Sequence, residues 1–143
     1  MHYVSAPLSI RFDPEILERL RQRARAVPGA TPSALAERLV DEGLRMAEHP
    51  GIVFKDGPSG RRAALALGPD VWEVVEASKE MEERGEKALV AVADILNLAQ
   101  GQVRTALRYY ADHQGEVDAE IDLNDQTSAQ AEEAFLVQQR LLA

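Results

Sequence analysis

Apolar and polar residues alternate along the first twelve residues of the chain. The even positions from 4 to 12 are all apolar, and the odd positions between them carry polar residues or proline. The apolar set is Val4, Ala6, Leu8, Ile10 and Phe12. A period of two is typical of a β-strand with one buried and one exposed face. The pattern therefore predicts a strand over residues 4–12.

The apolar residues that follow recur every three or four positions, which is the spacing of an amphipathic helix. Two stretches show it, at residues 14–26 and 32–48. Asp13-Pro14 and Thr31-Pro32 open these stretches, and each places a capping side chain before a proline at the first helical position. The Val-Pro-Gly-Ala sequence at 27–30 has the composition of a turn. The start of the chain thus predicts one strand followed by two helices.

A lone strand followed by two helices has no strand in its own chain to pair with. A second copy can supply one across a two-fold axis, and a unit of about 50 residues buries little core by itself. We therefore expect a homodimer whose paired strands form a ribbon that fits the major groove of DNA. The residues expected in the dimer core are Leu8, Ile10, Phe12, Leu35 and Leu39.

The chain from residue 50 to 121 predicts a second small domain. His49-Pro50-Gly51 ends the second helix and marks the boundary. Two apolar stretches, at 52–54 and 62–65, flank a turn-forming sequence at 56–60. This arrangement predicts a short β-hairpin.

Helices follow the predicted hairpin, the first of them beginning after Asp70. Residues 90–107 have the spacing of a helix-turn-helix, with Asn97 suited to the left-handed turn and with Val103 and Ala106 facing the preceding helix. We consider two roles for this module, a second contact with DNA and a packing or protein-binding function. The polar residues that its second helix displays are Gln102, Arg104, Thr105 and Arg108.

The C-terminal residues 122–143 form a predicted tail. Residues 122–128 are polar and turn-prone, and Ser128 is a suitable cap for a last helix. The apolar content of that helix exceeds what a free tail needs. Binding to a partner and packing on its own dimer both account for it. The residues concerned include Ala134, Phe135, Leu136, Leu141 and Leu142.

The formal net charge of −8 is unevenly distributed. Residues 1–49 contain seven Lys or Arg and seven Asp or Glu, so they are neutral. Residues 50–115 carry a net charge of −2, and residues 116–143 carry −6, with Arg140 as their only base. Basic residues near the ribbon can therefore contact phosphates while the acidic end of the chain meets a different partner.

Composition excludes several classes of chemistry. The chain has no cysteine, and its three histidines are scattered singly. No Ser/His/Asp, Cys/His or metal-ligand constellation occurs, so we expect no enzyme, no catalytic residue, no metal and no cofactor. No apolar run approaches the roughly 20 residues of a membrane span, and the N-terminus lacks a signal-peptide pattern. We expect a cytoplasmic protein without a membrane partner.

Three segments of the first unit carry a family resemblance: Leu8-Ser9-Ile10-Arg11-Phe12, Asp13-Pro14 and Thr31-Pro32-Ser33-Ala34-Leu35. They resemble the ribbon–helix–helix family, to which repressors of the MetJ and Arc type belong. The resemblance implies that Ser9 and Arg11 read base edges and that Thr31 and Ser33 hold a phosphate. The chemistry is suitable, because arginine can bond guanine O6 and N7 together and a helix N-terminus offers unpaired N–H groups.

Further residues extend the resemblance: His49-Pro50-Gly51-Ile52, Gly60-Arg61-Arg62-Ala63, Val71-Trp72-Glu73-Val74-Val75 and the run from Val103 to Ala111. Residues 50–121 resemble a small helix-turn-helix domain of unknown function found in bacterial toxin–antitoxin operons. Together with the first unit, they resemble the antitoxin of a VapBC-like pair. The resemblance implies a toxin with a PIN-type ribonuclease fold and autoregulation of the operon by the complex.

The same resemblance implies a role for the tail. Its apolar residues Phe135, Leu136, Leu141 and Leu142 would hold it on the toxin. Arg140 would meet the carboxylates that hold a divalent cation in a PIN-type active site, because a guanidinium fork suits paired carboxylates.

The sequence thus predicts a mainly α protein with a short β ribbon and three parts. Residues 1–49 form a ribbon–helix–helix dimerisation and DNA-binding unit, 50–121 a helix-turn-helix-like domain with a hairpin, and 122–143 a helical toxin-binding tail. The leading hypothesis is an antitoxin that neutralises its toxin and represses its operon. One alternative is a stand-alone homodimeric regulator whose middle domain senses a ligand or adds DNA contacts. The other is an interaction scaffold that does not bind DNA.

Overall fold

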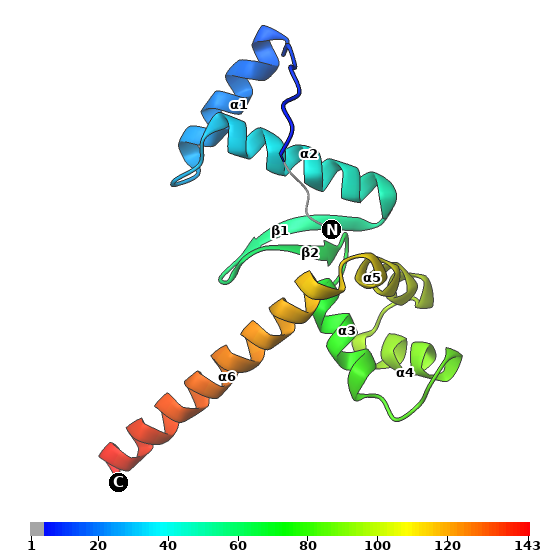
Figure 1. Cartoon of the computed structure of the whole chain (residues 1–143). Coiled ribbons are helices and arrows are strands. Elements are labelled where there is room, and N and C mark those ends of the chain that lie inside the picture. The colour runs from blue at the N-terminus through cyan, green and yellow to red at the C-terminus, as the bar shows by residue number, and fades with distance from the viewer. Residues whose placement is uncertain (1–4) are drawn as a thin grey trace. The chain divides into compact units, whose positions relative to one another are not determined.

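The computed structural model describes residues 5–143 and is mainly helical, with one two-stranded antiparallel sheet in that range (Figure 1). The chain divides into two compact units, one ending at Gly43 and one beginning at Leu44. This division lies inside the second helix, a few residues before the boundary expected at His49-Pro50. The elements are α1 (Pro14–Ala26), α2 (Pro32–Glu48), β1 (Ile52–Gly57), β2 (Gly60–Leu65), α3 (Val71–Glu80), α4 (Glu86–Leu96), α5 (Gln100–Asp112) and α6 (Gln114–Leu142).

The two helices of the first unit begin where the capping signals predict. The Asp13 carboxylate accepts a hydrogen bond from the backbone N–H of Glu15 at 2.9 Å, and Pro14 is the first residue of α1. The Thr31 hydroxyl accepts one from the N–H of Ala34 at 3.1 Å at the start of α2. Both bonds satisfy amide groups that have no partner inside the helix.

The segment before α1 forms no strand in the single chain. Residues 5–13 have no regular secondary structure, and Val4 lies outside the described residues. A strand requires a hydrogen-bonded neighbour, and the expected neighbour is a second copy. The predicted ribbon therefore stays a prediction about two chains.

The predicted β-hairpin is confirmed. β1 and β2 pair from Ile52 opposite Leu65 to Gly57 opposite Gly60. Pro58 and Ser59 form the two-residue turn, and Gly60 takes a φ of +115°, which only glycine adopts without strain. The hairpin turns one face, with Ile52, Ala63 and Leu65, into the core of the second unit.

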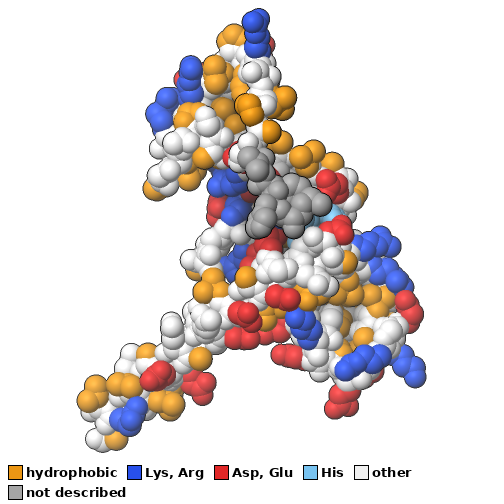
Figure 2. Space-filling view, viewed as in Figure 1, with side chains coloured by type: hydrophobic (Ala, Val, Ile, Leu, Met, Phe, Trp, Pro, Cys, Tyr) orange, Lys and Arg blue, Asp and Glu red, His pale blue; other side chains and the backbone are white. Residues whose placement is uncertain are grey.

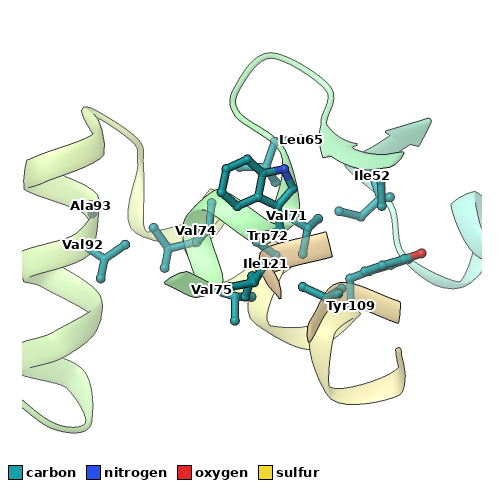
Figure 3. Close-up of a cluster of buried hydrophobic side chains, with 14 of the residues drawn as sticks. Ile52, Leu65, Val71, Trp72, Val74, Val75, Val92, Ala93, Tyr109 and Ile121 are labelled. Atoms are coloured by element: carbon teal, nitrogen blue, oxygen red, sulfur yellow. The ribbon is translucent and has the colours of Figure 1, made fainter. Parts of the chain in front are cut away.

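The core of the second unit lies among α3, α4, α5, the hairpin and the first turns of α6. Figure 3 shows Val71, Val74 and Val75 of α3 surrounded by side chains from these elements. Val103 and Ala106 are fully buried, as the helix-turn-helix spacing predicts. Asn97 has φ 54° and ψ 49°, the left-handed conformation expected at the turn between α4 and α5.

The last helix corrects one prediction. α6 is continuous over 29 residues, so no turn interrupts the chain at 122–128 and Ser128 does not start a helix. No glycine or proline follows Gly115, and the polar residues at 122–128 disfavour a helix only weakly. The Thr127 hydroxyl donates to the carbonyl of Leu123 at 2.9 Å, so its side chain bonds within the helix. No helix among residues 5–143 is long and apolar enough to cross a membrane.

Candidate functional site

The first unit exposes most of its apolar side chains. Among residues 5–43 only Ala24, Leu35 and Glu42 are buried. Leu8 is 81% exposed and Ile10 55% exposed. Of the five residues expected in a dimer core, the single chain buries only Leu35. The other four, Leu8, Ile10, Phe12 and Leu39, are exposed. The expected burial of those four side chains requires a second molecule.

Two apolar grooves adjoin Phe12 in this unit. One runs between α1 and α2, and Arg19 and Arg23 contribute to its lining. The other lies between residues 5–12 and the two helices. The apolar residues of the first groove are Phe12, Ile16, Leu20, Ala36, Leu39 and Val40.

The second groove reveals which side chains of the extended segment face the helices. Ala6, Leu8, Ile10 and Phe12 all line it and have even numbers, and Ser5 at the start of the described segment lines it as well. Pro7, Ser9 and Arg11 do not line it, although they alternate with those residues. From residue 6 onward the segment therefore has the two faces of a strand, apolar toward the helices and polar away from them.

The four residues expected to contact DNA are all exposed. Arg11 makes no hydrogen bond or ion pair within residues 5–143, so its guanidinium has all its donors available. Ser33 lies in the first turn of α2 and lines the groove beside residues 5–12. Thr31 caps the helix through its oxygen, which leaves its O–H as a donor. The structure thus places Ser33 near the extended segment that bears Ser9 and Arg11.

The helix-turn-helix face offers less to DNA than its sequence suggests. The Gln102 amide oxygen accepts a hydrogen bond from the N–H of Ala99 at 2.9 Å, so it caps its own helix. Arg104 forms an ion pair with Glu86 of α4 at 2.6 Å. Of these three residues, only Arg108 has no hydrogen bond or ion pair within the described residues. These interactions favour the packing or protein-binding role of the module.

The distal half of α6, residues 125–143, is exposed along its whole length. Figure 2 shows hydrophobic side chains at its end, at the lower left. Positions three, four and seven apart share one side of a helix. On this basis five apolar residues form one side, which we call the distal apolar face: Ala131, Ala134, Phe135, Leu141 and Leu142. Leu136 and Arg140 lie on the opposite side of the helix.

A polar cluster that the sequence did not predict lies where the last turn of α2, the end of α5 and the start of α6 meet. One nitrogen of Arg45 donates to the Tyr109 hydroxyl and to the Glu116 carboxylate, both at 2.8 Å. The Tyr109 hydroxyl also donates to Glu116 at 2.9 Å. The His113 ring stacks on Tyr109 at 4.4 Å between centroids, and His49 meets both rings edge-on. We call these five residues the corner cluster.

Sequence separation explains why the corner cluster was missed. Arg45 and Tyr109 are 64 positions apart, and no sequence pattern links the last turn of α2 to the end of α5. One indirect signal was present in the sequence: Tyr109 falls at a core position of α5, three residues after Ala106. A buried tyrosine needs a hydrogen-bond partner for its hydroxyl.

Burial shifts three pKa values in this region. The pKa of the fully buried Tyr109 is raised by desolvation. The pKa of His113 is lowered, first by burial and then by the nearby Arg45. The pKa of Glu120, one turn beyond Glu116, is raised to about 7, mainly by burial and then by the charge of Glu116. All three shifts oppose the charged form of the side chain.

The described residues contain no cluster of three or more His, Cys, Asp or Glu side chains that could hold a metal ion. Comparison of the chain with protein-family models, with curated proteins and with solved structures gave no match. The functional assignment therefore rests on the exposed surfaces described above and on the sequence.

Proposed function

We propose that the protein is a homodimeric DNA-binding antitoxin. In this proposal the first unit dimerises as a ribbon–helix–helix and binds operator DNA, and the distal half of α6 binds and neutralises a PIN-type ribonuclease. One observation carries the proposal. The even side chains of residues 5–12 line an apolar groove of a unit that buries only three of its described residues, while Ser9 and Arg11 do not line that groove.

A second copy is the occupant that best fits the first unit. Pairing of two extended segments would supply the backbone hydrogen bonds that each lacks and would cover Leu8, Ile10 and Phe12. Burying one large apolar side chain contributes about 1.5–3 kcal/mol. Residues 1–49 have no net charge, so two copies meet without electrostatic repulsion.

The resulting ribbon would present a polar face suited to DNA. With the apolar side chains turned inward, Ser9 and Arg11 of both copies point outward together. Arginine can make a bidentate contact with guanine, and serine can donate or accept a hydrogen bond. Thr31 and Ser33 at the start of α2 would bind a phosphate, because the first N–H groups and the dipole of a helix attract anions.

The distal half of α6 fits a partner of a different kind. Its apolar face is exposed, and residues 125–143 contain three acidic residues and one basic residue, a net charge of −2. This combination suits an apolar groove bordered by Lys and Arg, such as the RNA-binding rim of a ribonuclease. Because Arg140 lies opposite to the distal apolar face, it can approach a carboxylate site only from the outer side of the docked helix.

Co-expression with the product of the neighbouring gene tests the proposal. We expect the two proteins to purify as one complex, the complex to lack ribonuclease activity, and the complex to shift its upstream promoter in a salt-dependent manner. A promoter shift without a neighbouring ribonuclease would instead support the stand-alone regulator. Absence of both the complex and the shift would support the scaffold.

A further inference from the structure

His113 is the single non-helical residue between α5 and α6. Its backbone N–H donates to the carbonyl of Tyr110, and its carbonyl accepts from the N–H of Val117, both at 3.1 Å. Its ring stacks on Tyr109, which is fully buried. The position of this ring therefore helps to set the direction in which α6 leaves the domain.

Each histidine of the corner cluster has one ring nitrogen that is buried without a hydrogen-bond partner, although His113 as a whole is only partly buried. The Nε2 atoms of His113 and His49 are both inaccessible and unpartnered among the described residues. Nε2 of His49 lies 3.0 Å from the Asp112 carboxylate, but not in hydrogen-bond geometry. A neutral imidazole can leave a nitrogen lone pair unused at modest cost, whereas a buried imidazolium N–H without an acceptor is expensive.

We propose that His113 is a proton-sensitive hinge: the corner between α5 and α6 is closed while its ring is neutral, and protonation moves the ring off Tyr109 into water and frees the first turns of α6. The proposal concerns α6 itself and stands whether or not the distal half binds a ribonuclease. Acidification would then alter how the chain presents its acidic, apolar end to any partner.

Charged groups from three elements face the His113 ring. Arg45 and His49 at the end of α2 oppose a positive charge on it, while Asp112 and Glu116 favour one. Glu116 is paired with the Arg45 guanidinium at 2.8 Å, so the positive charge of Arg45 offsets the attraction of Glu116 for a further cation. Burial and the charge of Arg45 have larger effects than the two carboxylates, so the pKa of His113 in the closed corner is lower than that of a free histidine.

The direction of the pH effect follows from this difference. The opened ring binds a proton near pH 6.5, whereas the closed ring resists protonation below that pH. Opening is therefore favoured as the pH falls below about 6.5, by at most about tenfold per pH unit for one proton. Glu120 has the opposite effect, because its raised pKa makes the closed corner bind a proton at acid pH. The substitution Glu120→Gln removes that opposing contribution.

Hydrogen exchange of the full chain tests the hinge. Protection factors would be measured for the amides of Val117 and Ile121 at pH 7.5 and pH 5.5 in Glu120→Gln and in Glu120→Gln/His113→Phe. Phenylalanine keeps the stack on Tyr109 and removes the titrating group. We expect protection in the first variant to fall severalfold at pH 5.5 and protection in the second to stay constant. Amides of Val74 and Val92, in the core of the same unit, serve as internal controls.

Equal protection at the two pH values in Glu120→Gln would overturn the proposal, as would an equal loss in the phenylalanine variant. Should the double variant fail to fold, the histidine resonances of the unmodified chain decide the question. A His113 pKa measured at or above 6.5 excludes the hinge, whereas a lower value with loss of the Tyr109 ring contact on titration supports it. Neither result depends on DNA or on a toxin.

Discussion

The first unit and the distal half of α6 both expose large apolar side chains, but they differ in charge and in shape. Residues 1–49 are neutral and contain grooves, and the extended segment beside those grooves has an apolar and a polar face. The distal half of α6 is a single exposed helix, and residues 125–143 have a net charge of −2.

From this difference we expect two kinds of partner. A neutral surface with unpaired backbone groups is suited to an identical copy, which offers the missing strand and no repulsion. Two copies of the acidic helix would repel one another if they paired side by side in the same direction. An apolar helix face flanked by carboxylates instead suits a groove with basic edges in a different protein. We therefore expect substitutions in the two regions to separate self-association from partner binding.

The largest effect is expected from Ile10→Asp. A carboxylate at the centre of the ribbon would be buried without a partner, so dimers should be lost and the first unit should unfold. Sedimentation and circular dichroism measure both. Ser9→Asp is the matched control, because it places the same charge one residue away on the outer face. Ser9→Asp should keep the dimer and weaken DNA binding. A folded dimer of Ile10→Asp would contradict the ribbon.

Removal of the chain after Asp122 should abolish partner binding and leave the dimer intact. The residues removed are exposed apart from the half-buried Asn124, and the hydrophobic core ends at Ile121, so their loss removes no core side chain. Co-purification and growth rescue measure partner binding, and sedimentation measures the dimer. Retained rescue by the shortened chain would show that the distal half of α6 is not the inhibitor.

Arg11→Ala should relax DNA sequence discrimination. Loss of a bidentate contact with guanine costs about 1–3 kcal/mol, whereas Ser33→Ala should weaken binding to all sequences alike. Competition assays with specific and unrelated duplexes distinguish the two effects. If Arg11→Ala retains its sequence selectivity, a different surface must contact the bases. Arg108 is then the first residue of α5 to test.

Glu120→Gln should stabilise the protein at pH 8. The folded-state pKa of Glu120 is raised to about 7 from an unfolded value of 4.5, so stability falls as the pH rises through that interval. Full burial would make the penalty roughly 3 kcal/mol, and because the side chain is only half-buried we expect about 1 kcal/mol. Thermal melts should show a gain that grows from pH 4.5 to 7 and is constant above. A gain that is the same at pH 4 contradicts this cause.

The smallest effects should distinguish the two sides of α6. Phe135 is 56% exposed and Leu136 is 52% exposed. A lysine therefore adds the same charge at a similarly exposed site in either variant, and the two substitutions are matched. Phe135→Lys should weaken partner binding more than Leu136→Lys or Arg140→Glu, because only Phe135 lies on the distal apolar face. Titration calorimetry with the purified partner measures the order. The reverse order would place Arg140 in the contact, as the resemblance implies.

Local signals in the sequence predicted local structure well. Asp13 and Thr31 as caps, the hairpin turn at Pro58-Ser59 and the left-handed Asn97 all depend on one or two residues and their neighbours. The turn expected at 122–128 was wrong, because weak helix propensity is not a break when no glycine or proline is present.

Contacts between distant positions could not be predicted in the same way. The corner cluster joins Arg45 to Tyr109 and Glu116 across more than 60 residues, and no periodic pattern marks such a set. The ion pair between Arg104 and Glu86 likewise depends on how α4 and α5 pack. The DNA contacts considered for α5 therefore stay a prediction, whereas the alternation in residues 5–12 is visible in the sequence itself.

Disulfide trapping of the ribbon tests the central claim most directly. The chain has no cysteine, so one cysteine at a time can be placed at each position from 5 to 12 of the full chain. In a two-fold antiparallel ribbon a residue faces its own copy only near the axis, where Cα atoms are about 4.5–5.5 Å apart and a disulfide can form. We predict efficient interchain disulfides at one or two adjacent central positions and little at the ends. No disulfide at any position, or equal yields at all of them, would contradict the account.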